Sequence, residues 1–167
     1  DSDRIILFFG FVRKYKGLDL LINSMAQNAF PQNVKLIIAG EFYDNPEEYS
    51  QLIERYNLID RVIVHNRFIS DEDIPVFFCA ADLVTQTYRT ATQSGITQMA
   101  LHYEIPVLVT RVGGLDEFVE DGKTGLFADV EASDIAKKIW SFFDTDQMDM
   151  IANIRLTKEK YSWDTFV

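Results

Sequence analysis

The stretch "IILFFGFVRKYKGLDLLINSMAQNAFPQNVKLIIAG", residues 5–40, decides the expected fold. Its two ends, residues 5–11 and 34–40, are apolar almost throughout, and the segment between them at about 18–29 has the length of a helix. Strands that are apolar on both sides suit a parallel sheet with helices on each face. This strand–helix–strand unit therefore predicts an α/β fold.

The same alternation continues to the end of the chain. Further strands are predicted at 61–65, 81–86, 106–110 and 125–128. Further helices are predicted at about 46–57, 71–80, 94–103, 115–120, 132–145 and 147–160. Repeated units of this kind predict a doubly wound, Rossmann-like parallel sheet with right-handed crossovers and helices on both faces. Because no repeat, low-complexity tract or linker interrupts the chain, residues 1–167 are predicted to form a single domain.

The amino-acid composition of the chain argues against some kinds of binding partner. With 26 acidic and 16 basic residues, a net charge of −10 leaves no basic surface for nucleic acid. The single cysteine, Cys79, lies in an apolar run and is predicted to be a small buried hydrophobe, which fits a reducing, cytoplasmic location. Because the chain begins almost directly on a strand, we expect that it was cut from a longer protein near a domain boundary at Asp1.

The loop after the first strand is the first candidate site. In open parallel sheets, ligands bind outside the carboxyl ends of the strands, where helix N-termini attract anions. The loop "GFVRKYKG", residues 10–17, places Arg13, Lys14 and Lys16 between two glycines in an otherwise acidic chain. This local reversal of charge favours a phosphate site, and a solvated basic turn is the alternative.

The loop after the fifth strand is the second candidate. Gly113 and Gly114 precede a short helix that has Glu117 in its first turn. Paired glycines let backbone N–H groups approach a phosphate, although a loop that needs positive φ explains them equally well. The chain has neither a G-x-G-x-x-G after the first strand nor a P-loop motif, and His65 and His102 lack the companions of a metal site. No metal is therefore expected.

The chain resembles a known family at this point. The likeness is carried by "FFGFVRKYKGLDLLINSM" (8–25), "KLIIAGEF" (35–42), "RVIVHNRFISDEDIPVFFCAADLV" (61–84) and "IPVLVTRVGGLDEFVEDGKTGLFADV" (105–130). In order and spacing these segments are similar to the C-terminal half of family 4 retaining glycosyltransferases, whose GT-B fold has two Rossmann-like domains around the active-site cleft. The most specific element is K-G after the first strand, followed by P-V, V-G-G and D-G-x-x-G.

The resemblance implies a site for a nucleotide sugar. Lys16 matches the family lysine that contacts the diphosphate, and Arg13 is a candidate substitute for the family arginine, whose place Phe11 takes. Both are expected to be catalytic by stabilising the departing diphosphate, in a retaining transfer that uses no metal or other cofactor. The residues expected to contact the donor are Gly10, Gly40, Glu41, Arg67, Thr90, Thr92, Gln93, Ser94, Gln98, Gly113, Gly114 and Glu117.

The segment "RTATQSGITQMAL", residues 89–101, departs from the family. Where the family has two glutamates separated by seven residues, Thr90 and Gln98 lie nearest and the segment contains no acid. An amide carbonyl or a hydroxyl can still accept a bond from a ribose or sugar hydroxyl, although a charged acceptor binds about twice as strongly. We interpret the segment as a remodelled donor site. The alternative is a polar first turn of a helix whose Met99 and Leu101 face the core.

Three functions therefore remain open. The first is the donor-binding half of a carbohydrate-biosynthesis glycosyltransferase, which alone would bind a nucleotide sugar but transfer little, because its N-terminal acceptor-binding domain is absent. The second is a degenerate, non-catalytic interaction domain, which the missing carboxylates favour. The third, a receiver-like signalling domain, ranks last because no acidic pair follows the first strand. The base, the sugar and the acceptor are not determined, and attachment to a membrane surface through the absent half stays open.

Overall fold

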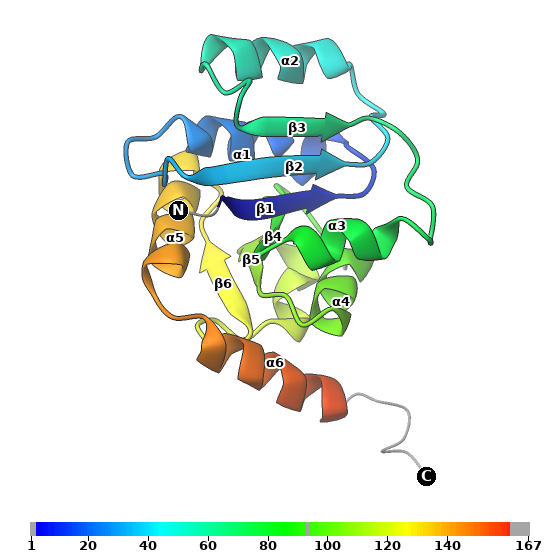
Figure 1. Cartoon of the computed structure of the whole chain (residues 1–167), viewed down its shortest axis with the longest axis vertical. Helices are drawn as coiled ribbons and strands as arrows, with labels where there is room; N and C mark the ends of the chain where they lie inside the picture. The colour runs from blue at the N-terminus through cyan, green and yellow to red at the C-terminus, as the bar shows by residue number, and fades with distance from the viewer. Residues whose placement is uncertain (1–2, 93, 161–167) are drawn as a thin grey trace.

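The computed structural model describes residues 3–92 and 94–160, without the side chains at 116, 117, 159 and 160 (Figure 1). Its strands are β1 (Arg4–Phe9), β2 (Val34–Ala39), β3 (Val62–His65), β4 (Leu83–Gln86), β5 (Val107–Thr110) and β6 (Gly125–Ala128). All pair in parallel, in the order β3-β2-β1-β4-β5-β6. The predicted α/β class and doubly wound parallel sheet are confirmed.

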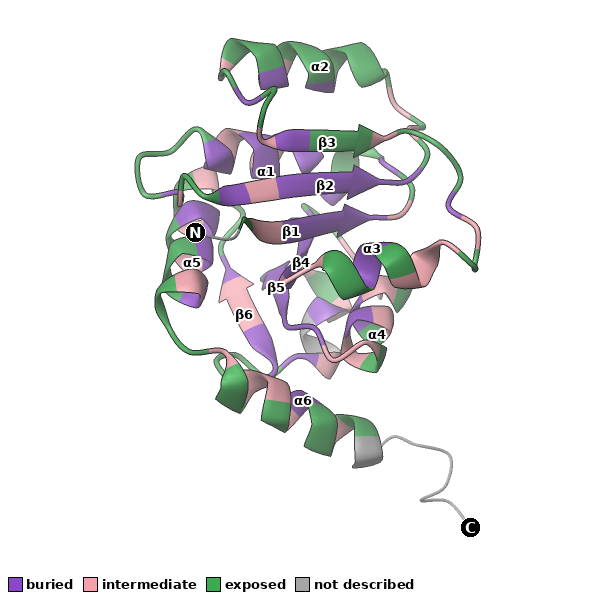
Figure 2. Cartoon of the chain, in the orientation of Figure 1, coloured by how far each residue is buried: buried purple, intermediate pink, exposed green. Residues whose placement is uncertain are grey.

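Helices cover both faces of this sheet. They are α1 (Leu18–Met25), α2 (Pro46–Arg55), α3 (Ile74–Ala80), α4 (Gly95–His102), α5 (Ala132–Asp144) and α6 (Met148–Lys160), with short 3-10 helices η1 (Lys14–Lys16) and η2 (Gly113–Phe118). One apolar cluster joins α1, α2 and α5 to one face, and a second joins α3, α4 and η2 to the other. Figure 2 shows β1 and β2 coloured mostly as buried.

The alternation of side chains along β1 explains why its sequence is apolar from Ile5 to Phe9. Ile6 and Phe8 belong to the first cluster, whereas Leu7 and Phe9 belong to the second. Residues 6–9 are thus each covered from one face or the other, as is typical of the inner strands of a parallel sheet. From β1 the chain first builds β2 and β3 on one side and then crosses to β4 on the other. The carboxyl ends of β1 and β4 therefore form the topological switch point where ligands bind in such sheets.

The prediction for Cys79 is wrong. In α3 the neighbouring Phe77 and Phe78 are buried against the sheet, whereas Val76 and Cys79 lie on the exposed side. A helix that covers one face of a sheet buries only one side of itself, so an apolar run through it does not place every residue inside. The expectation of a reducing compartment loses this support.

No helix among the residues described has the length and apolar character needed to cross a bilayer.

Candidate functional site

Two glycines bring the ends of β1 and β2 into contact. Gly10 has φ 96° and Gly40 has φ 150°, in the region that favours glycine. The N–H of Gly10 donates to the carbonyl of Ala39 at 2.9 Å, and a Cβ on Gly40 would lie 2.0 Å from the carbonyl oxygen of Gly10. A hollow of about 220 Å³ opens above this contact, and its lining includes Phe9, Phe11, Lys16, Glu41 and Phe68. We call it the β1–β2 hollow.

A second hollow lies between η1 and the start of α4. It measures about 580 Å³, and its lining includes Tyr15, Lys16, Tyr88, Thr90, Thr92 and Ser94. Ser94 also begins α4, because its hydroxyl accepts a hydrogen bond from the N–H of Ile96 at 3.3 Å. We call this space the β4–α4 hollow. Lys16 lines both hollows and therefore stands where they meet.

Lys16 is a buried cation. It is 9% exposed, and its Nζ lies 5.6 Å from the centroid of the Tyr88 ring. Among the described residues, no carboxylate lies within ion-pair distance of this ammonium. Burial, and then the charge of Arg13, lower the pKa of Lys16 from its ordinary value. A buried charge without a counter-ion costs free energy, which a bound anion would offset.

The other two basic residues of the loop 10–17, Arg13 and Lys14, contact other side chains. The guanidinium of Arg13 lies 4.4 Å from the centroid of the exposed Tyr43 ring, and Arg13 is absent from the lining of both hollows. Lys14 pairs with Glu48 at 3.4 Å. The structure thus separates the three basic side chains that the sequence groups together.

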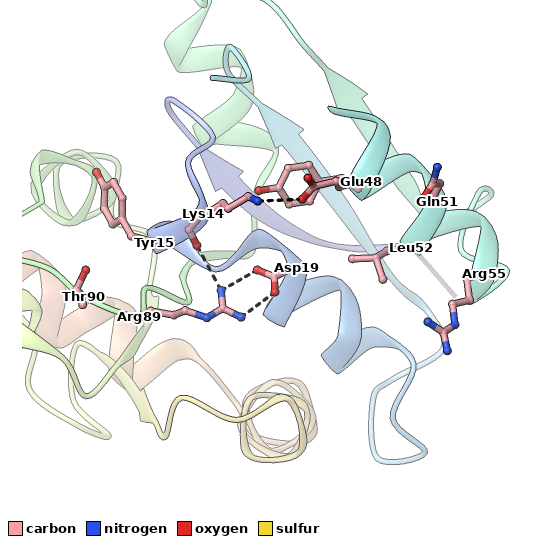
Figure 3. Close-up of a pocket in the computed structure, with 10 residues that line it drawn as sticks. Lys14, Tyr15, Asp19, Glu48, Gln51, Leu52, Arg55, Arg89 and Thr90 are labelled. Carbon is pink, nitrogen blue, oxygen red and sulfur yellow. Dashed lines mark hydrogen bonds and ion pairs between the residues drawn. The ribbon is translucent and has the colours of Figure 1, made fainter. Parts of the chain in front are cut away.

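A third hollow, larger than these two, has residues of η1 and α2 in its lining (Figure 3). This outer hollow measures about 690 Å³ and includes Lys14, Asp19, Glu48 and Arg89 in its lining. Its Arg89 forms a bidentate ion pair with Asp19, with both N–O distances at 2.7 Å. The outer hollow meets the β4–α4 hollow at Tyr15 and Thr90. Unlike the β1–β2 and β4–α4 hollows, the outer hollow does not have Lys16 in its lining.

Arg67 and Gln98, two of the expected donor contacts, are absent from the lining of the two hollows. Arg67 pairs with Asp73 at 2.9 Å. Gln98 is exposed on α4 and lines a separate hollow together with Asp71 and His102. Gln93 and the Glu117 side chain lie outside the described parts of the chain. The roles of these residues stay predictions.

Gly113 and Gly114, in the loop after β5, differ in backbone conformation. Gly113 has φ 54°, and a Cβ there would lie 1.6 Å from the carbonyl oxygen of Ala91. Gly114 has φ −93°, which other residues adopt as well. Gly113 therefore brings η2 against the loop that precedes α4, in the neighbourhood of the β4–α4 hollow.

This fold and its sequence match a family. Residues 1–157 match the family described as Glycosyl transferases group 1. The chain belongs to this family. It is 27% identical over 164 residues to an uncharacterized glycosyltransferase of Methanocaldococcus jannaschii, covering 96% of this chain and 45% of that protein. It is 30% identical over 135 residues to mannosylfructose-phosphate synthase of Agrobacterium fabrum, covering 75% of this chain and 29% of that protein. This glycosyl transferases group 1 chain thus spans less than half the length of these relatives.

Solved structures agree with the family assignment. The Anabaena protein HepE, crystallised in complex with UDP, superposes with a TM-score of 0.86 at 25% identity, covering 98% of this chain and 46% of that chain. The C-terminal domain of a glycosyl transferase group 1 family protein (LpcC) from Francisella tularensis has a TM-score of 0.84 at 18% identity, covering 96% of this chain and 86% of that chain. The second likeness shows the fold alone. The predicted family and the Rossmann-like half of a GT-B fold are confirmed.

Tyr88 lines the β4–α4 hollow of this glycosyl transferases group 1 chain and is a candidate site residue that was not predicted from the sequence. It is 3% exposed, and burial raises the pKa of its hydroxyl to about 12. The ring of Tyr15 meets it edge-on at 6.0 Å. A signal was present in the sequence, because the polar run Thr85, Gln86 and Thr87 follows directly on the apolar part of a predicted strand, and the structure buries all three residues. Buried polar residues at the carboxyl end of a parallel strand indicate a site.

The described residues contain no group of three His, Cys, Asp or Glu side chains that could hold a metal ion.

Proposed function

We propose that this chain is the nucleotide-sugar-binding domain of a retaining glycosyltransferase, which transfers a sugar from a nucleoside-diphosphate sugar to an acceptor. The observation that carries the proposal is Lys16, a buried ammonium without a carboxylate partner between two hollows at the switch point. The UDP complex of the similar HepE protein supports it.

The two hollows and Lys16 would each hold one part of the donor: the nucleoside, the sugar and the diphosphate. The β1–β2 hollow, with Phe9, Phe11 and Phe68, offers aromatic faces to a nucleoside. The diphosphate would lie at Lys16. The β4–α4 hollow has hydroxyls from Thr90, Thr92 and Ser94 in its lining, and these can donate to and accept from the hydroxyls of the donor sugar.

The proposed chemistry is electrostatic. When the bond between the anomeric carbon and the phosphate oxygen breaks, negative charge grows on the departing diphosphate. The Lys16 ammonium would stabilise that charge in a site that excludes much of the water, with Arg13 adding positive charge nearby. In this scheme the protein's own cations supply the charge, with no cofactor beyond the donor substrate. The acceptor would be held by a further domain of a longer protein.

Calorimetry on this chain with UDP, GDP and ADP tests the proposal. We expect at least one nucleoside diphosphate to bind with a Kd of about 1 mM or lower, equivalent to about 4 kcal/mol or more. Binding should weaken about 30-fold or more in Lys16→Ala and be kept in Lys14→Ala, because the Lys14 side chain points into the outer hollow and pairs with Glu48. Absence of binding by all three nucleotides, or an equal loss in both variants, would contradict the proposal.

The second candidate is a non-catalytic interaction domain. It is favoured by the absence of carboxylates from the segment 89–101 and by the position of Gln98, which lies outside the two hollows that Lys16 lines. This candidate expects no nucleotide binding at all. Sugar transfer by the full-length protein that disappears in Lys16→Ala would exclude it.

A further inference from the structure

The loop after β4 holds the turn that carries Lys16. The N–H of Arg89 donates to the carbonyl of Tyr15 at 2.6 Å, and the hydroxyl of Thr87 donates to the carbonyl of Gly17 at 2.8 Å. A Cβ on Gly17, where φ is 66°, would lie 2.0 Å from the carbonyl oxygen of Thr87. The two loops are therefore in direct backbone contact on either side of Lys16.

The Arg89 side chain adds a second connection (Figure 3). Its Nη1 and Nη2 donate to the two carboxylate oxygens of Asp19, and Nη1 also donates to the carbonyl of Lys14 at 3.3 Å. Lys14 begins η1, and Asp19 lies in the first turn of α1 just after it. One guanidinium thus joins the two ends of the turn. A bidentate fork of this kind fixes orientation as well as charge.

Arg89 is already committed to protein groups. Its positive charge is matched by the carboxylate of Asp19, and its donors at Nη1 and Nη2 point to Asp19 and the Lys14 carbonyl. Lys16 differs in both respects, because its ammonium is buried and has no carboxylate partner among the described residues. A lysine side chain has several rotatable bonds, and a loosened turn would let its ammonium move toward water.

We propose that Arg89 is a positioning residue, which acts through Asp19 and the Lys14 carbonyl to hold the turn so that the Lys16 ammonium faces a diphosphate. The proposal rests on the proposed function, because it takes Lys16 as the cation that meets the ligand. It assigns a role to Arg89, which the resemblance to the family left without one. The benefit is preorganisation, since a cation fixed before binding needs no ordering when the ligand arrives.

Asp19→Ala gives the sharpest test, because positioning and direct charge attraction predict opposite signs. If Arg89 contacted the diphosphate itself, removal of Asp19 would free its charge and strengthen UDP binding. If Arg89 positions Lys16, removal of Asp19 weakens binding even though an acid has been taken away from an anion site. By calorimetry on the whole chain we expect UDP binding to weaken about fivefold to tenfold in Asp19→Ala and in Arg89→Ala. Unchanged or tighter binding in Asp19→Ala would overturn the proposal.

Double variants with Lys16→Ala show whether the effect runs through Lys16. At UDP concentrations high enough to measure the weakened binding, Asp19→Ala should cause no further loss in the Lys16→Ala background, because residues that act as a unit are not additive. Additive losses would mean that Asp19 and Arg89 act independently of Lys16, against the proposal. The controls are Arg111→Ala and Asp129→Ala, which each remove one half of an ion pair that lies 3.9 Å apart at the same edge of the sheet. Both should keep wild-type affinity.

A measurement without nucleotide separates failure of this proposal from failure of the proposed function. Lysines carrying ¹³C-methyl groups give one NMR signal each, and the signal missing from Lys16→Arg identifies Lys16. Because the Lys16 ammonium lies near the Tyr88 ring, its signal should be displaced from the exposed lysines by the ring current. In Asp19→Ala the signal should move toward those of the exposed lysines. An unmoved signal would overturn the positioning role whether or not any nucleotide binds.

Discussion

The β1–α1 turn and the β4–α4 loop each bring one cation to the same edge of the sheet, and they treat it in opposite ways. Lys16 in the turn is 9% exposed and has no carboxylate partner among the described residues. Arg89 in the loop has a side chain that is 41% exposed, and it forms a bidentate pair with Asp19. The exposed cation is neutralised by the protein, and the buried one is not.

This difference separates a structural charge from a ligand-binding charge. Pairing at the surface contributes little to stability but can fix geometry when the fork is bidentate. An unpaired charge inside the protein lowers stability, and it persists where a ligand supplies the missing partner. By this criterion we propose the site at Lys16 and not in the larger outer hollow beside Arg89.

Loss of the two cations should affect nucleotide affinity unequally. Lys16→Met removes the cation proposed to contact the diphosphate and should weaken UDP binding about 30-fold or more, which equals about 2 kcal/mol. Arg89→Met removes the same charge but should weaken binding about fivefold, because its effect is indirect. Titration calorimetry measures both. Equal losses would remove the distinction between the two regions.

A single added carbon atom at Gly17 should disrupt the contact between the β1–α1 turn and the β4–α4 loop. A Cβ on Gly17 would lie 2.0 Å from the Thr87 carbonyl oxygen at φ 66°, so Gly17→Ala should cost about 2 to 3 kcal/mol in the free energy of unfolding. The matched control is Gly95→Ala, where nothing lies within 4 Å of the added Cβ. Denaturant unfolding should show the control at wild-type stability or slightly above it. Equal stability of the two variants would show that the turn and the loop do not depend on this contact.

Thermal stability should change in the opposite direction to binding at Lys16. Lys16→Met replaces an unpaired buried ammonium with an apolar side chain of similar length, so without ligand the Tm should rise by about 2 to 4 °C, or about 1 kcal/mol. The same substitution at Arg89 breaks an ion pair and should leave the Tm equal or lower. Differential scanning calorimetry at neutral pH measures both shifts. A lower Tm for Lys16→Met would mean that the ammonium is stabilised in the free protein.

The dependence on pH gives the smallest expected effect. Because burial lowers the pKa of Lys16, its ammonium loses its proton at a lower pH than an exposed lysine does. UDP affinity should therefore fall as pH rises from neutral toward that lowered pKa. The stability of the free protein should rise over the same range, because the unfolded chain binds the Lys16 proton more tightly than the folded chain does. Asp19 raises the pKa of Arg89, so Arg89 keeps its charge throughout. Affinity that does not change with pH would contradict a role for the Lys16 ammonium.

The sequence predicted the fold well because local patterns determine it. Apolar runs of strand length and the helices between them identified all six strands of the sheet, although the first strand ends at Phe9 and not at Phe11 as predicted. The 3-10 form of residues 113–118 was missed, since a short polar segment with two glycines carries little helical signal. Burial of Cys79 was predicted wrongly because composition does not say which side of a helix meets the sheet.

The site was predicted less completely because its contacts are distant in sequence. The basic loop put Arg13, Lys14 and Lys16 side by side, but the direction of each side chain depends on η1, which turns Lys16 inward and leaves Arg13 on Tyr43. The pairing of Arg89 with Asp19 spans 70 residues, and no local pattern indicates it. The donor contacts expected from the family resemblance stay predictions until a ligand is observed.

A crystal structure of this chain with UDP or GDP tests the central claim most directly. We expect the diphosphate at the junction of the β1–β2 and β4–α4 hollows, with a phosphate oxygen about 2.7 to 3.2 Å from the Nζ of Lys16 and the Arg89–Asp19 pair intact. A diphosphate bound in the outer hollow, with Lys16 still buried against Tyr88 and without a partner, would contradict it.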